Sequence, residues 1–88
     1  MTLEDQIILA LSMVLRERRE GLSLSQSELA RLSGLHRSYI GDLERGSRNI
    51  SVRNLTRLAE AMDMQPSKLM TQAEKKLKTE GPFKKKRK

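Results

Sequence analysis

The sequence of 88 residues contains no cysteine and a single histidine, His36. A chain without cysteine has no disulfide framework, no thiolate metal site and no cysteine nucleophile. One histidine also supplies too few ligands for a zinc site. We therefore expect neither a metal nor a cofactor. The absence of disulfides is compatible with an intracellular compartment.

Long apolar runs are missing as well. The longest, from Ile7 to Leu15, spans nine residues and is interrupted by Ser12. A helix needs roughly 18 to 20 apolar residues to cross a bilayer. The acidic residues before this run, Glu4 and Asp5, argue against a secretory signal. These features predict a soluble, cytoplasmic protein with no membrane partner.

Aromatic residues are scarce, because Tyr39 and Phe83 are the only two in the chain. The core is therefore expected to consist of aliphatic side chains and methionine. No segment of four or more residues alternates apolar and polar as a strand does, whereas several segments repeat at helical spacing. The predicted fold class is all-α, in a single small domain.

The net charge of +7 is distributed unevenly. Residues 75–88 hold eight basic residues and one acidic residue, and residues 1–74 are neutral. The basic residues of the first part are nearly all arginine, which suits bidentate recognition, and those of the second part are nearly all lysine, a mobile point charge. This contrast predicts a specific domain at 1–77 and a basic flexible tail at 78–88, disordered when free. The alternative is a tail that only solubilises the domain.

Helix boundaries are indicated by capping patterns. Ser25, His36 and Ser51 each stand at a cap position, where the preceding apolar residue can pack on the fourth helical position, and Pro66 suits the first position of a helix. Gly34 suits a left-handed helix end, as does Gly46. The predicted helices are 3–20, 25–33, 36–45, 51–62 and 66–77. The predicted core stripe of the first is Leu3, Ile7, Leu11, Val14 and Leu15.

The second and third helices, with Gly34 between them, predict a helix-turn-helix at about 25–45. The start of the third helix is the end that points into the DNA major groove in this motif, and Arg37 has the geometry to hold two acceptors of one guanine. Gly41 costs about 1 kcal/mol inside a helix relative to alanine. We expect it to allow close approach to a ligand, and the alternative is a neutral surface glycine. The outward face of the third helix is predicted to consist of Arg37, Ser38, Gly41, Asp42 and Arg45.

These segments resemble the phage-repressor-like helix-turn-helix proteins of the Xre or Cro/CI type, which include restriction-modification controller proteins. The resemblance runs from about Leu15 to Leu69. It is carried by Leu24–Ala30, Ser33–Ile40, Leu43–Gly46 and Leu55–Met62. It implies a compact five-helix repressor-like domain that binds double-stranded DNA as a homodimer on a pseudo-palindromic operator. Such a protein is a transcription regulator of a prokaryote or phage, associated with the nucleoid, and not an enzyme.

The resemblance also implies roles for individual residues. His36 departs from the serine or threonine usual at its position, and is interpreted as a polar cap. A structural ion pair is implied between Arg19 and Glu44. The implied contacts to DNA bases are Arg37, Ser38, Tyr39 and Asp42, and those to phosphates are Gln26, Arg45 and Arg48. Independently of the resemblance, Lys84, Lys85 and Lys86 of the tail are expected to bind phosphates without sequence preference.

The fifth helix and the segment before it carry more apolar side chains than a small domain easily covers. We expect this surplus to form the dimer interface. The alternative is that it closes the fifth helix onto the core. The residues concerned are Met62, Met64, Leu69 and Met70.

Two other functions fit the same sequence. One is a protein-interaction module, such as an antitoxin or a coactivator adaptor, because related helix-turn-helix domains serve in these ways. The other is a nucleic-acid binder that uses the basic tail without sequence preference.

Overall fold

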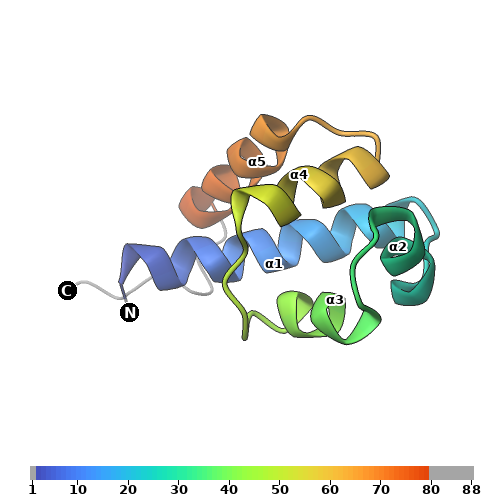
Figure 1. The fold of residues 1–88 in the computed structure, drawn as a ribbon. Coiled ribbons are helices and arrows are strands. Elements are labelled where there is room, and N and C mark those ends of the chain that lie inside the picture. The colour runs from blue at the N-terminus through green and yellow to red at the C-terminus, as the bar shows by residue number, and fades with distance from the viewer. Residues whose placement is uncertain (1, 80–88) are drawn as a thin grey trace.

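The computed structural model describes residues 2–79, which form five helices joined by short connections (Figure 1). No strand occurs in this part of the chain. The predicted all-α class and the five predicted helices are confirmed. The expected tail lies outside the described residues from position 80, and with it Lys84, Lys85 and Lys86. The helices are α1 (Leu3–Gly21), α2 (Gln26–Ser33), α3 (Arg37–Glu44), α4 (Val52–Ala61) and α5 (Pro66–Thr79).

Local side-chain hydrogen bonds define where the helices begin. The Ser25 hydroxyl accepts from the Glu28 backbone N–H at 3.0 Å, and the Glu28 carboxylate accepts from the Ser25 N–H at 2.7 Å. Thr2 and Asp5 form the same reciprocal pair at the start of α1. His36 is the residue before α3, but within residues 2–79 its side chain makes no capping hydrogen bond. The predicted polar cap is wrong at the side chain, because an imidazole does not replace the short hydroxyl of serine or threonine there.

Two glycines with left-handed backbone follow α2 and α3. Gly34 has φ +77° and Gly46 has φ +75°, as the sequence predicted. A Cβ atom on Gly46 would lie 2.6 Å from Cδ2 of Leu9, so the connection after α3 packs closely on α1. The final helix extends two residues beyond the predicted end, to Thr79.

Helix α1 runs along the molecule, with α5 packed along one side and α3 along another (Figure 1). Helix α2 contacts α3 and α4, and α4 in turn contacts α5. The interior they enclose is aliphatic. It consists of Ala10, Leu11, Val14, Leu15, Leu29, Ala30, Ile40, Leu43, Leu55, Leu58, Ala59, Met62, Leu69 and Ala73. No helix of the described part is long and apolar enough to span a membrane.

Two expectations about apolar residues need correction. Leu3 is 67% exposed and Ile7 is only partly buried, because the first turns of α1 lie at the end of the molecule (Figure 1). The fully buried part of the predicted stripe therefore begins at Leu11. Met62 and Leu69 are completely buried within the single chain, so they close α5 onto the core and offer no surface to a partner.

Candidate nucleic-acid interface

The helix-turn-helix presents a polar surface around α3. Arg37 and Ser38 are exposed in its first turn, and Arg45 and Arg48 are exposed beyond its last. Tyr39 and Asp42 are partly buried. The residues expected to contact bases therefore lie at the start and middle of α3, and the arginines expected to contact phosphates lie at its end.

A buried ion pair fixes α3 to α1. The Arg19 Nε and Nη2 atoms donate to the two carboxylate oxygens of Glu44 at 2.6 and 2.9 Å, and the side chains are only 10% and 5% exposed. Arg19 Nη1 also donates to the Leu24 carbonyl at 2.7 Å. The ion pair that the resemblance implied is thus present, with bidentate geometry and a third bond to the chain that leads into α2.

Gln26 connects this ion pair to the start of α3. Its Nε2 donates to Glu44 Oε1 at 2.9 Å, and its Oε1 accepts from Arg37 Nη1 at 3.0 Å. Both ends of the amide are thereby engaged inside the protein. A continuous series of hydrogen bonds runs from Arg19 through Glu44 and Gln26 to Arg37, so the orientation of Arg37 depends on a buried charge pair.

Gly41 lies in a different place from the one expected. It is buried, and a Cβ atom there would lie 3.4 Å from Arg45 Nη1 and 3.7 Å from Gln26 Oε1. The outward position predicted from helical spacing is wrong, because α2 packs on α3 at this point and the side chains of Gln26 and Arg45 cover the glycine. Its missing side chain makes room for those residues.

The carboxylate of Asp42 is shared by two arginines of the same surface. Arg45 Nη2 pairs with Asp42 Oδ1, and Arg48 Nη1 donates to Asp42 Oδ2 at 3.5 Å. The Ser47 hydroxyl donates to the Asp42 carbonyl at 3.0 Å, which holds the connection after α3 against the helix. The structure therefore places three of the predicted DNA contacts in one charged cluster.

A hollow of about 500 Å³ lies between α3 and α4 beside this cluster, with His36 and Ser38 in its lining. Tyr39 lies in its wall. The tyrosine hydroxyl accepts from Asn54 Nδ2 at 2.9 Å, and the guanidinium carbon of Arg48 lies 5.2 Å from the ring centre.

Arg57 also lines this hollow, from α4. Sequence reasoning did not single out Arg57 or Asn54. Both could have been found, because the buried residues of α4, Leu55 and Leu58, leave the preceding positions 54 and 57 on a neighbouring polar face.

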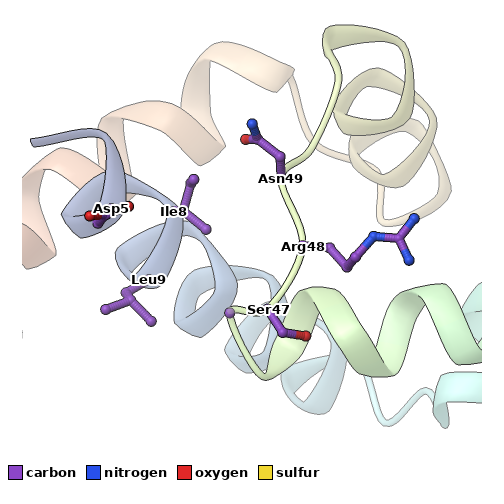
Figure 2. Close-up of a pocket in the computed structure, with 7 residues that line it drawn as sticks. Asp5, Ile8, Leu9, Ser47, Arg48 and Asn49 are labelled. Atoms are coloured by element: carbon purple, nitrogen blue, oxygen red, sulfur yellow. The ribbon is translucent and has the colours of Figure 1, made fainter. Parts of the chain in front are cut away.

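A second hollow, of about 390 Å³, lies between the N-terminal half of α1 and the connection from α3 to α4. Figure 2 shows Ile8 and Leu9 on the α1 side and Ser47 and Asn49 on the connection. The Arg48 side chain extends away from α1 in this view, in agreement with its contacts to α3. Arg48 therefore belongs to the surface of the helix-turn-helix.

Burial and hydrogen bonding compete at Glu44. Burial alone would raise the pKa of this carboxyl, but the hydrogen bonds from Arg19 and Gln26, with the positive charges of Arg19 and Arg16, together outweigh burial and hold the pKa below its ordinary value. The bond to Glu44 likewise raises the pKa of Arg19 against the effect of burial. Both groups are therefore charged at neutral pH, as a structural ion pair requires.

The described residues hold no group of three histidine, cysteine, aspartate or glutamate side chains placed to bind a metal ion. The one buried carboxylate of the interface, Glu44, is fully used by Arg19 and Gln26. What the surface offers is a set of hydrogen-bond donors and positive charges around a short helix, which is the chemistry that base edges and phosphates need.

Comparison with known sequences places this geometry in context. Residues 15–69 match a family described as helix-turn-helix. The control protein C.SmaI of Serratia marcescens is 46% identical over 56 residues, which are 64% of this chain and 67% of that protein. The control protein C.BamHI of Bacillus amyloliquefaciens is 44% identical over 48 residues, 54% of this chain and 59% of that protein.

Solved structures give the same result. The restriction-modification controller protein C.AhdI from Aeromonas hydrophila is 48% identical, with a TM-score of 0.69, covering 70% of this chain and 94% of that one. The controller protein C.Esp1396I, solved as a tetramer in complex with its natural 35 base-pair operator, is 25% identical, with a TM-score of 0.77. That match covers 83% of this chain and 96% of the controller.

Proposed function

Because this chain belongs to the Xre-type helix-turn-helix family of DNA-binding transcription regulators, we propose that it recognises a specific operator in double-stranded DNA as a homodimer. The operator is pseudo-palindromic, since a symmetric dimer presents two identical reading surfaces. The observation that carries the proposal is the exposed start of α3, where Arg37 is held by Gln26. Its site of action is the nucleoid, in the cytoplasm of a prokaryote or phage host.

Base reading is assigned to the start and middle of α3. The bond to Gln26 uses Arg37 Nη1, so Nη2 and Nε are left to donate to O6 and N7 of a guanine. Ser38 is exposed beside it and offers a hydroxyl as donor or acceptor. Tyr39 and Asp42 contribute from the edge of the same surface, where both are partly buried.

Phosphate binding is assigned to Arg45 and Arg48, which are exposed just beyond the last residue of α3. Gln26 is retained as a phosphate contact, although its amide already bonds Glu44 and Arg37, so its larger role is to position Arg37. The tail lysines Lys84, Lys85 and Lys86 would add salt-dependent affinity for any duplex.

We expect one duplex sequence, enriched by the protein from a random library, to keep its advantage over random duplex at about 150 mM salt, where nonspecific affinity falls steeply. Fluorescence anisotropy with labelled duplexes measures both affinities. Equal affinities for the two duplexes would identify a nonspecific binder that relies on charge. Absence of duplex binding, together with a protein partner captured after nuclease treatment, would identify an interaction module.

The proposed dimer uses the α5 side of the molecule. Met64 and Met70 are partly exposed there, whereas the neighbouring Met62 and Leu69 belong to the core. Partly exposed methionines suit a packed interface because their side chains adapt to irregular surfaces. Helix α3 packs on a different side of α1 from α5 (Figure 1), so two copies joined through α5 keep both reading surfaces free.

We expect light scattering at tens of micromolar protein to give the mass of a dimer. Met70→Glu should shift the protein towards monomer, because it places a charge in the apolar contact. Gln72→Glu is the matched control, since it adds the same charge to α5 at an exposed position. A monomer mass for the wild type, with and without DNA, would refute the dimer.

A further inference from the structure

Asp42 is a carboxylate on a surface proposed to bind a polyanion. Its two oxygens pair separately with Arg45 and Arg48, one oxygen for each guanidinium. The Asp42 side chain is 30% exposed, and the two arginines are 67% and 55% exposed. The two cations assigned to phosphates are thus both paired with one anion of the protein, which offsets half of their combined charge.

These ion pairs are weak enough to exchange. An exposed ion pair contributes little to stability, so a phosphate can displace the carboxylate. Displacement still has a cost, because each arginine must leave Asp42 before it binds DNA. Arg48 keeps a second contact when it does so, since its guanidinium carbon lies 5.2 Å from the centre of the Tyr39 ring.

We propose that Asp42 is a specificity determinant that competes with DNA phosphates for Arg45 and Arg48. The proposal rests on the DNA-binding function above. In the free protein the carboxylate occupies both guanidinium groups and thereby lowers the affinity for every duplex. A duplex is bound well when it offers Asp42 a hydrogen-bond donor in place of Arg45 and Arg48.

Compensation depends on the bases that face Asp42. A released carboxylate on α3 accepts a hydrogen bond from the amino group of a cytosine, N4, or of an adenine, N6, in the major groove. Guanine O6 and thymine O4 are acceptors. Next to either of them, the carboxylate finds no hydrogen-bond donor and lies close to the negatively charged phosphates. Asp42 therefore weakens binding most at sequences that lack an amino group at this position.

The test is Asp42→Asn, which preserves the shape of the side chain and removes its charge. We expect the affinity for random duplex to rise about two- to ten-fold, the size of one or two exposed ion pairs. The affinity for the enriched duplex should rise less, so the discrimination between the two falls. Site selection with the variant should also relax the preference for an amino-bearing base at one position. An unchanged thermal midpoint shows that the variant folds.

The control is the same substitution in a chain that already carries Arg45→Ala and Arg48→Ala. There Asp42→Asn should leave random-duplex affinity nearly unchanged, because nothing remains for the carboxylate to sequester. An equal gain in both backgrounds means a long-range charge effect and overturns the proposal. In another outcome, the wild type shows no preference among duplexes, while Asp42→Asn gains affinity only in the chain that retains Arg45 and Arg48. That result refutes the specific function and leaves the competition standing. A wild type with a clear preference and no gain on Asp42→Asn refutes the competition alone.

Discussion

Replacing Glu44 by alanine should lower the free energy of unfolding by about 3 to 5 kcal/mol, because it leaves a charged group buried without its partner. That group is Arg19, whose side chain is only 10% exposed and which makes two of its hydrogen bonds to Glu44. Small domains are stable by only about 5 to 15 kcal/mol, so much of the fold's stability is at stake. Urea unfolding followed by circular dichroism measures the change.

Arg16→Ala is the matched control, because it leaves Glu20 in place beside Arg19, 3.8 Å away. Arg16 pairs with Glu20 at 3.1 Å, and both side chains are more than half exposed. Its loss should change stability by at most about 1 kcal/mol. Similar losses from the two variants would mean that the Arg19–Glu44 pair contributes no more than a surface pair.

The pH dependence of stability tests the same pair by another route. The pKa of Glu44 is lowered in the folded protein, so its contribution is fully present above the pKa of the unfolded carboxyl, ordinarily 4.5, and is lost as the pH falls through the folded value. Glu28 also has a lowered pKa, through its bonds to Ser25, and acts in the same direction. Glu44→Gln should therefore lose less stability below pH 4.5 than the wild type does, with the Glu28 contribution common to both proteins. Parallel pH profiles would contradict this.

Arg37→Ala should weaken binding to the enriched operator by about 1 to 3 kcal/mol and relax the preference at one base pair. The reason is that Arg37 opens α3 and is held by Gln26 in a position from which two of its nitrogens remain to bind a guanine. The loss on random duplex should be smaller, because a nonspecific complex does not use the base edge.

Arg45→Ala is the contrasting variant. Arg45 is exposed at the far end of α3, so its loss should weaken all duplexes by a similar factor and reduce the salt dependence by about one phosphate contact. Binding-site selection from a random library, carried out with the wild type and both variants, separates the two roles. Identical enriched motifs from the wild type and Arg37→Ala would exclude Arg37 as a base reader.

The parts of the fold that could be predicted are those that depend on near neighbours in the chain. The capping box of Ser25 and Glu28 involves residues three positions apart, and the left-handed end at Gly34 depends on the absence of one side chain. Such features can be predicted from the sequence because the helix itself brings the atoms involved together. All five helices were therefore found, with ends that differ by a few residues.

The features that could not be predicted depend on contacts between distant helices. Gly41 was expected on the open face, yet α2 covers it with Gln26. Met62 and Leu69 were expected at a dimer surface, yet α5 packs so closely on the rest of the chain that both are fully buried. Helical spacing gives the direction of a side chain around its own axis. It does not say which other helix lies in that direction.

The pairing of Asp42 with Arg45 and Arg48 was missed for a related reason. The resemblance implies a DNA contact for each of the three residues and no contact among them. Residues three apart on a helix are neighbours, so the spacing of Asp42 and Arg45 is enough to predict their ion pair. Arg48 lies in the connection beyond α3, and its position follows from the turn at Gly46.

Three consecutive residues of α1 are each bound to a different part of the molecule. Glu17 pairs with Lys76 of α5 at 2.9 Å. Arg18 donates to the Met62 carbonyl at the end of α4 at 2.8 Å, and Arg19 holds Glu44 of α3. Successive side chains of a helix point about 100° apart, so one turn of α1 contacts three other helices. In the proposed dimer, the interface helix α5 and the base-reading helix α3 would both be bound to that turn of α1. The position of the reading helix relative to the interface helix would then be fixed within each protomer.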